Sequence, residues 1–230
     1  MKRLVIEDTV LVDAVLRELE AQGSEENRRM HARYGVSRPT FGVPYRELKK
    51  LQKQLRMDQA LAEQLWESGY HDARLLATLI AEPQRLTPAV ADRWTRECDD
   101  DALAEALCAL MWRSPIIGQC APRWRVSPEP WVAIVGWCVT RHQAPALENQ
   151  TCEELITLIG EHIADMAPRV QHQMNLALIA LGVRGDDELR DLALVVAGKI
   201  GPLAVDDPRG DRTPDAANEI RRGSRMKNRA

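Results

Sequence analysis

The 230-residue chain has few aromatic residues and no long apolar run. Only 4% of its residues are aromatic, whereas 45% are hydrophobic and 28% charged, a balance that excludes wholesale disorder. The longest apolar stretch, residues 131–139, is far shorter than the roughly 20 residues of a membrane-spanning helix. Acidic residues follow the start too soon for a secretory signal, so we expect a cytoplasmic protein without membrane contact.

Motifs for metals and cofactors are also missing. The five cysteines are scattered without a CxxC pair, which indicates reduced thiols rather than a disulfide framework or a zinc site. The histidines lack the HExxH spacing, and each is expected as a surface or capping residue. No GxSxG, GxGxxG or P-loop sequence is present. We therefore expect no metal, no nucleotide cofactor and no other cofactor.

The net charge of −3 is unevenly distributed along the chain. Residues 28–56 contain nine Lys or Arg and one acid, and residues 217–230 contain five Lys or Arg and one acid. Residues 57–216 carry 14 basic and 25 acidic residues. The overall charge argues against a histone-like nonspecific binder, but the first segment could form a local face for an anionic ligand. The alternative is a solvated helix face followed by a basic tail.

Apolar residues recur with the period of an α-helix through most of the chain. Spacings of i, i+4, i+7 and i+8 are typical of amphipathic helices. Residues 131–139 are apolar all round, which predicts a buried helix, and no comparable segment alternates with period two. The clearest stripes are Leu103, Leu107, Leu110 and Met111; Leu155, Ile156, Ile159 and Ile163; Val170, Met174, Leu178 and Leu181; and Leu189, Leu192, Val196 and Ile200.

Several helix starts can be placed from capping signals. Thr151 and Glu154 have the spacing of a capping box, and Asp58 and Asp186 are further N-cap candidates. Together with the stripes, these signals predict about ten to twelve helices. Four more starts are expected where a hydroxyl residue precedes proline; they are Thr87, Ser114, Ser127 and Thr213.

Short connections between these helices predict antiparallel neighbours, and helix pairs of about 30–45 residues are typical of HEAT-like repeats. We expect an all-α protein, a right-handed superhelical α-α solenoid whose repeats are degenerate because no repeated residue pattern is visible. A compact orthogonal bundle is the alternative. The expected organisation is one HEAT-like domain over residues 1–220 and a basic, disordered tail over residues 221–230.

The most prominent group of carboxylates is the acidic cluster at residues 99–101 together with Glu105. Asp101 and Glu105 are spaced i, i+4 and lie roughly opposite the Leu103 stripe, so both should face a groove or solvent. The alternative is that the cluster caps a helix and interacts with its positive N-terminal dipole. Some of the six tryptophans could stack on a base, but packing between repeats is the simpler explanation for each.

Three stretches of the chain share one further pattern. Residues 33–48 contain RYGVSRP, GVP and YREL; residues 65–77 read LWESGYHDARLLA and lead to ADRW at 91–94; residues 198–216 contain GKIG, VD and TPDA. Together they resemble the DNA alkylation repair family, the AlkD-like HEAT-repeat alkylpurine DNA glycosylases. The resemblance covers most of residues 20–216, and the second stretch is its most specific part.

This resemblance implies a C-shaped helical solenoid that holds double-stranded DNA in a basic concave cleft. Active members of the family cleave the N-glycosidic bond of N3- or N7-alkylated purines without a metal, a cofactor or base flipping. A carboxylate stabilises the positive charge that develops on the sugar, tryptophans pack against the deoxyribose, and an arginine holds the backbone. A cationic purine is already a good leaving group, so this charge stabilisation does most of the remaining work.

The resemblance also assigns roles to individual residues. It places Glu105 at the family's catalytic acid and Asp101 at an aromatic residue that contacts the sugar. An arginine of the family falls on Ile134 and a tryptophan on Leu176, so Glu105 and Asp101 are catalytic candidates in a site that lacks three supporting groups. The expected DNA contacts are Arg28, Arg29, Arg33, Tyr34, Arg38, Lys49, Lys50, Lys53 and Arg74, and the expected groove-lining residues are Trp131, Trp137 and His172.

The hypothesis is therefore a DNA-binding HEAT-like protein with weak, altered or absent glycosylase activity. The alternative is a non-enzymatic helical scaffold whose groove binds a protein partner. Salt-sensitive DNA binding would favour the first, and a stoichiometric protein partner without DNA affinity would favour the second.

Overall fold

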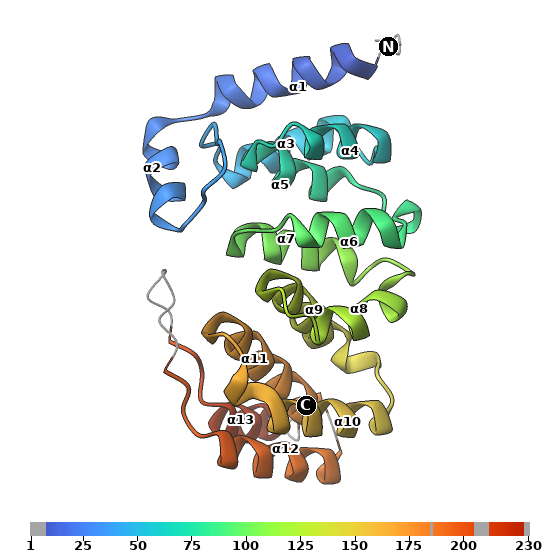
Figure 1. Ribbon diagram of the computed structural model, residues 1–230, viewed down its shortest axis with the longest axis vertical. Helices are drawn as coiled ribbons and strands as arrows, with labels where there is room; N and C mark the ends of the chain where they lie inside the picture. The colour runs from blue at the N-terminus through green and yellow to red at the C-terminus, as the bar shows by residue number, and fades with distance from the viewer. Residues whose placement is uncertain (1–7, 185, 205–211, 228–230) are drawn as a thin grey trace. The chain divides into compact units, whose positions relative to one another are not determined.

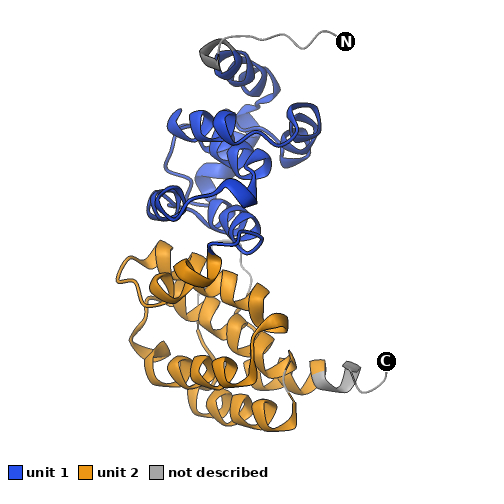
Figure 2. Cartoon of the chain, turned by 90° about the vertical axis from the view of Figure 1, so that its right-hand side faces the viewer, with its two compact units in different colours: residues 1–116 blue, residues 117–230 orange. Residues whose placement is uncertain are grey.

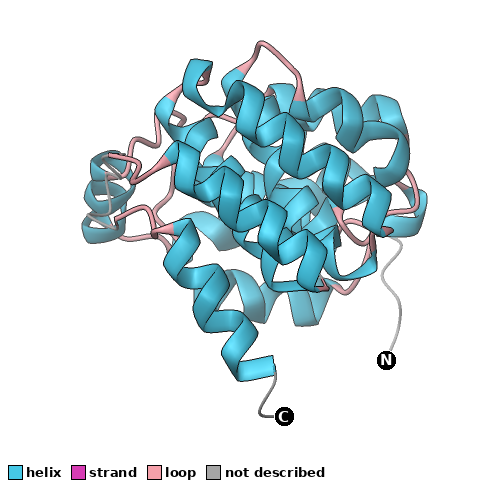
Figure 3. Cartoon of the chain, turned by 90° about the horizontal axis from the view of Figure 1, so that it is seen from below, coloured by secondary structure: helices cyan, strands magenta, loops and turns pink. Residues whose placement is uncertain are grey.

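The computed structural model describes residues 8–184, 186–204 and 212–227, which contain thirteen α-helices and three short 3-10 helices. Figure 3 shows helices joined by loops, and no strand element occurs in these residues. The all-α prediction is confirmed, with slightly more helices than expected. Val205 and Asp206, part of the third resembling stretch, lie outside the described residues. No described helix combines the length and apolar character needed to cross a membrane.

The helices form two compact units, residues 1–116 and residues 117–230 (Figure 2). Their order along the chain can be followed in Figure 1. The first unit contains α1 (Asp8–Gln22), α2 (Glu25–Arg33), α3 (Tyr45–Leu55), α4 (Gln59–Glu67), α5 (His71–Ile80), η1 (Pro83–Arg85), α6 (Pro88–Arg96) and α7 (Asp101–Met111). The second unit contains α8 (Ile117–Arg125), α9 (Pro130–Gln143), η2 (Ala144–Ala146), α10 (Asn149–His162), η3 (Ile163–Asp165), α11 (Pro168–Arg184), α12 (Asp187–Ile200) and α13 (Ala216–Lys227).

Helix α5 lies at the centre of the first unit, in contact with α3, α4 and α7. Nine of its ten residues are buried, so solvent reaches almost none of its surface. Leu76 and Ile80 are fully buried, and burying such a side chain contributes about 1.5–3 kcal/mol. His71, Asp72 and Arg74 are buried on the same helix, and these polar groups therefore need partners inside the protein.

Helix α9 is the corresponding buried helix of the second unit, in contact with α8 and α11. Residues 132–140 are all buried, which confirms the buried helix predicted for this segment, although Trp131 at its start is only half-buried. Gly136 permits the close approach of α8. A Cβ added there would lie 2.7 Å from the backbone nitrogen of Arg125 and 2.8 Å from the carbonyl carbon of Trp124.

Three of the predicted N-caps are confirmed. The side chain of Thr87 accepts a hydrogen bond from the N–H of Val90, and proline follows it at the first position of α6. The carboxylates of Asp58 and Asp186 each accept an N–H three residues later, at 3.0 Å. Each cap satisfies one of the backbone donors that a helix leaves unpaired at its start.

The other predicted starts are wrong, for more than one local reason. Ser127 accepts the N–H of Glu129 at 3.2 Å, which closes a turn before α9 begins. Asp215, rather than Thr213, accepts the N–H of Asn218 at 2.8 Å, so the carboxylate caps α13. The two remaining starts are also displaced: α8 begins at Ile117 rather than directly after Ser114, and α10 begins at Asn149, before Thr151.

Helix α13 continues past residue 220, where the tail was expected to begin, and reaches Lys227. It contacts α11 and α12, and Ile220 is fully buried. A Cβ added to Gly223 would lie 2.6 Å from Cγ2 of Val183, so α13 still touches its unit at this residue. Residues 228–230 lie outside the described residues, and the single domain expected over residues 1–220 stays a prediction.

We predict that Gly136→Ala destabilises the protein, because the new methyl group would overlap backbone atoms of α8 that cannot move independently. Overpacking of this kind costs about 1–3 kcal/mol. Urea unfolding should show a lower midpoint for the variant. Gly118→Ala is the matched control, because no atom lies within 4 Å of a Cβ added there and alanine favours the helix. Equal midpoints for the two variants would contradict the close approach.

Candidate nucleic-acid interface

The loop between α2 and α3 is fastened to α5 by one buried carboxylate. Asp72 accepts the N–H of Phe41 at 2.6 Å, the N–H of Val43 at 2.8 Å and the hydroxyl of Thr40 at 2.8 Å. Its side chain has no solvent exposure, so these donors replace the water that an ionised carboxylate would otherwise require. Asp72 therefore fixes the path of the loop that precedes α3.

The same loop also holds α2. The carbonyl oxygen of Gly42 accepts a hydrogen bond from the N–H of Ser24 at 3.1 Å. The carbonyl oxygen of Phe41 accepts a hydrogen bond from the guanidinium of Arg28, also at 3.1 Å. Gly42 has φ +74°, and a Cβ there would lie 2.5 Å from the Ser24 carbonyl oxygen. Only glycine suits both the conformation and the contact. The start of α2 thus depends on the loop that Asp72 fixes.

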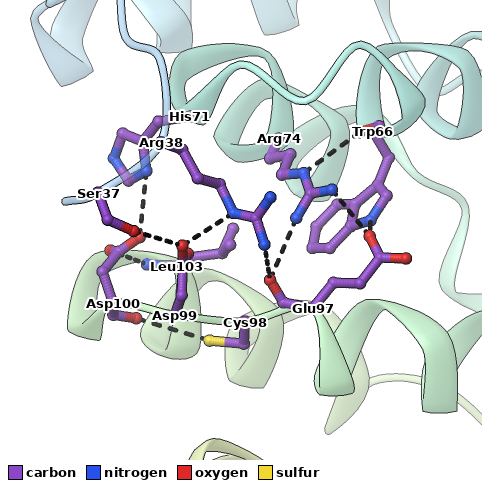
Figure 4. Close-up of polar contacts among 10 residues, drawn as sticks. All are labelled: Ser37, Arg38, Trp66, His71, Arg74, Glu97, Cys98, Asp99, Asp100 and Leu103. Carbon is purple, nitrogen blue, oxygen red and sulfur yellow. Dashed lines mark hydrogen bonds and ion pairs between the residues drawn. The ribbon is translucent and has the colours of Figure 1, made fainter.

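A buried histidine and aspartate connect α5 to the start of α7. His71 Nδ1 lies 3.1 Å from Asp100 Oδ2, and both side chains are almost completely buried. The other oxygen of Asp100 accepts the N–H of Leu103 at 2.9 Å and caps α7 (Figure 4). Burial raises the pKa of Asp100. The contact with His71 and the hydrogen bonds from the N–H groups of Leu103 and Ala102 lower it by more, so the net shift of the pKa is downward.

His31 of α2 lies against His71, the histidine of this pair. Its ring meets the ring of His71 edge-on with centroids 5.1 Å apart, and its Nδ1 lies 2.8 Å from the hydroxyl oxygen of Thr40. Burial, followed by the charge of His71, lowers the pKa of His31.

Glu97 connects α4 and α5 through a second cluster (Figure 4). Its carboxylate oxygen Oε2 accepts the indole N–H of Trp66 at 2.7 Å and the guanidinium of Arg74 at 2.8 Å. Arg74 lies over the Trp66 ring, 4.6 Å from its centroid, and the other face of Trp66 stacks on Trp94 with centroids 4.4 Å apart. Burial lowers the pKa of Arg74, with a further contribution from the charge of Arg38.

Arg38 joins this cluster from the loop before α3. Its Nη2 donates to the carbonyl oxygen of Glu97 at 2.7 Å, and its Nε lies 3.0 Å from Asp99 Oδ2. Ser37 donates to the same carboxylate oxygen at 3.0 Å (Figure 4). The guanidinium of Arg38, expected at a DNA contact, is therefore engaged by the segment before α7 and only about a quarter exposed.

The second resembling stretch, residues 65–77, thus supplies the internal supports of the first unit. Trp66, His71, Asp72 and Arg74 all have buried side chains with partners in other elements. Arg74 was expected to contact DNA, but it is only 6% exposed and binds Glu97 and Trp66 instead. In the structure Arg74 therefore connects the end of α4 with the segment before α7.

The remaining expected cations of the first unit lie on helix faces open to solvent. Residues 25–55 contain eight Lys or Arg and three Glu, a net charge of +5. Arg28 and Arg29 pair with Glu25, and Arg46 and Lys50 pair with Glu47. We call the exposed cations of the two helices the α2–α3 basic surface; its members are Arg28, Arg29, Arg33, Arg46, Lys49, Lys50 and Lys53.

The glutamates of this surface are held in the charged form by their neighbours. The hydrogen bond and charge of Arg28 lower the pKa of Glu25, and the hydrogen bond from Lys50 lowers the pKa of Glu47. Both pairs are at the surface, where ion pairs are weak and easily exchanged. An approaching polyanion can therefore replace the glutamates as partner of these cations. Tyr34, expected beside them, ends α2 and is 38% exposed.

Helix α7 carries the two candidate carboxylates. Leu103, Leu107 and Leu110 are fully buried, so the predicted core face of this helix is confirmed. Glu105 is exposed and Asp101 is half-buried, as expected for residues on the other side of the helix. Asp100, not Asp101, is the N-cap, which leaves the carboxylate of Asp101 in the first turn.

The expected groove-lining residues lie in the second unit and differ in exposure. Trp137 is 1% exposed, so it belongs to the interior of this unit rather than to a groove surface. Trp131 is half-buried with the guanidinium of Arg169 5.5 Å from its ring centroid. His172 is half-buried, and its Nδ1 lies 2.9 Å from the hydroxyl oxygen of Thr213.

Sequence reasoning did not identify Glu97 or the pairing of His71 with Asp100. The residues that meet here are 23 to 31 positions apart in the chain, and no local spacing reveals such contacts. A signal was nevertheless present in α5, where the ionisable residues His71, Asp72 and Arg74 precede a run of mostly apolar residues. When a helix is buried on all sides and carries ionisable groups, these groups require polar or charged partners from other elements.

Comparison with known proteins identifies the family. The family model described as DNA alkylation repair enzyme matches residues 15–199, which is most of the chain. The chain belongs to the DNA alkylation repair enzyme family. The resemblance inferred from the three sequence stretches is thereby confirmed.

A solved structure is also similar to this DNA alkylation repair family member. It is described as belonging to "a new family of proteins related to the HEAT-like repeat DNA glycosylases with affinity for branched DNA structures". The TM-score is 0.82 at 23% sequence identity, and the match covers 94% of each chain. This likeness confirms the HEAT-like fold class. No curated protein matches the chain in sequence.

We predict that Asp100→Asn destabilises this family member by about 1–3 kcal/mol near neutral pH, because a buried hydrogen-bonded charge is removed. The folded-state pKa of Asp100 lies below its ordinary value of 3.8, so its contribution is present above that value and is lost as pH falls through the lower folded pKa. The difference in unfolding free energy between wild type and variant should therefore shrink in acid.

Urea unfolding from near-neutral to acidic pH measures this effect. Asp13→Asn, at an exposed position on α1, is the control and should leave the stability curve close to that of the wild type. A difference for Asp100→Asn that stays constant or grows in acid would contradict the downward pKa shift.

Proposed function

We propose that this protein binds DNA through the α2–α3 basic surface. The observation that carries the proposal is the solvent face of α3, where Arg46, Lys49, Lys50 and Lys53 recur at helical spacing and are exposed. The opposite face is fixed to the unit, because Leu48 and Leu51 are buried and Gln52 donates to the carbonyl oxygen of Leu79 at 2.8 Å. A row of cations on a rigid support suits a polyanion with regularly spaced phosphates.

Membership of the DNA alkylation repair enzyme family supports nucleic acid as that polyanion. The similar solved structure is described as having affinity for branched DNA, which makes branched as well as linear DNA a substrate to test. A protein with net charge −3 is repelled by DNA at long range except through its basic surface. Binding should therefore be local, oriented and strongly dependent on salt.

We further propose that hydrolysis of alkylated purines by this chain is slow or absent. Glu105 offers an exposed carboxylate on α7, which a developing positive charge on a sugar could approach. The groups that assist such a carboxylate in the family fall on Asp101, Ile134 and Leu176, which are neither aromatic nor cationic. Ile134 is buried at 2% exposure, so it cannot hold a phosphate in place of an arginine.

Reversing the charges at Lys49 and Lys50 should weaken binding to every DNA sequence. The logarithm of the DNA-binding constant falls linearly with the logarithm of the salt concentration, and each lost phosphate contact makes this slope shallower by about one. The double variant Lys49→Glu with Lys50→Glu should therefore make the slope shallower by about two. Fluorescence anisotropy of labelled duplexes at several salt concentrations measures this slope. The matched control, Arg17→Glu with Lys199→Glu, changes the same charge at exposed positions outside the surface. Equal losses for the two double variants would exclude a specific role for the α2–α3 basic surface.

Base release from alkylated DNA tests the carboxylate. In single-turnover reactions we expect slow release of 7-alkylguanine or 3-alkyladenine at most, and Glu105→Gln should lower any such rate by about 10²–10³. Rapid release that Glu105→Gln leaves unchanged would exclude this role for Glu105. If the protein binds DNA but releases no base, it is a DNA-binding protein that has kept the family scaffold without the reaction. If it binds a protein partner and has no affinity for DNA, the scaffold alternative is favoured.

A further inference from the structure

Exposed apolar side chains gather in the same segment as the basic residues. Seven large hydrophobic side chains are exposed among the described residues. Four of them fall within residues 30–57: Met30 at 40%, Tyr34 at 38%, Tyr45 at 55% and Met57 at 44%. Single exposed hydrophobic residues are common, but their coincidence with the most basic part of the chain points to a ligand that offers both charge and apolar faces.

Tyr45 is the most exposed aromatic residue of this group, and packing does not explain its position. It occupies the first residue of α3, directly after the loop that Asp72 fixes. Phe41, four residues earlier, uses its ring internally by stacking on Tyr70 with centroids 4.3 Å apart. Tyr45 instead projects more than half of its surface into solvent from a rigid helix start.

One cation lies over the ring of Tyr45, and a second is its neighbour in the sequence. Lys49 lies one helical turn later, with its ammonium 5.8 Å from the ring centroid. Arg46 is adjacent in sequence and its side chain is 81% exposed. A nucleotide stacked on the ring would therefore have its phosphate within reach of a flexible cation, which is the combination that proteins use for single-stranded nucleic acid.

We propose that Tyr45 is a stacking platform for an unpaired base of DNA, with Lys49 and Arg46 binding the adjacent phosphates. The inference rests on the DNA binding proposed above and specifies its substrate class as DNA with unpaired nucleotides, such as a flap or an open branch point. In a continuous duplex both faces of each base are covered by neighbouring pairs. Only an unpaired or terminal base offers a free face to an aromatic side chain on an exposed helix surface.

Two DNA ligands with the same duplex test the proposal: the continuous duplex alone, and that duplex with a short single-stranded flap that contains 2-aminopurine. Anisotropy should show tighter binding of the flapped ligand by the wild type. Tyr45→Leu keeps an apolar side chain but removes the ring, and it should weaken flap binding about tenfold, within the range of one lost base–aromatic stack. Its affinity for the continuous duplex should stay close to that of the wild type.

Tyr45→Phe is the matched control, because it retains the ring and should retain the preference for the flap. The fluorescence of 2-aminopurine should be quenched by the wild type and by Tyr45→Phe, but much less by Tyr45→Leu. Equal binding of flap and duplex by the wild type, or an unchanged preference in Tyr45→Leu, would overturn the stacking role while leaving duplex binding intact. Failure of the wild type to bind either ligand would overturn the proposed DNA binding itself.

Discussion

The first unit depends on the buried carboxylate of Asp72. An ionised group without solvent contact requires several donors, and Asp72 obtains them from Thr40, Phe41 and Val43 of one loop. The loop then holds α2 through Gly42 and leads directly into α3. The helices that carry the surface cations are therefore joined by a loop whose path is fixed by a buried carboxylate.

The most specific part of the family pattern, residues 65–77, has the same supporting character. Trp66 and Arg74 meet Glu97 before α7, and His71 meets the cap residue Asp100. These contacts determine where α7 starts and thus where its carboxylates lie. A pattern that identifies the family can therefore persist for structural reasons, whatever the chain does to DNA, because fold and activity depend on different residues.

Much of the fold could be predicted from the sequence, because apolar periodicity is a local property. The stripe at Leu103, the buried helix at 132–140 and the cap at Thr87 are all present. Predictions were wrong where a competing local group intervened, as Asp215 does before α13, and incomplete where burial depends on distant partners. Arg74 and Trp137 belong to residue types that serve both surfaces and interiors, and only their neighbours in space distinguish the two.

Binding and hydrolysis make different demands on such a scaffold. A basic surface acts through summed charge, so it tolerates exchange of one cation for another and small shifts of position. Hydrolysis of a glycosidic bond requires a carboxylate, a sugar contact and a backbone clamp in one geometry, and misplacement by about 1 Å can cost about 10²-fold in rate. In this chain the α2–α3 basic surface is supported by buried contacts, whereas the resemblance puts Asp101, Leu176 and Ile134 where the sugar contacts and the clamp are expected. The proposed DNA binding therefore depends on fewer exact positions than the proposed hydrolysis would, because summed charge tolerates shifts that a reacting geometry does not.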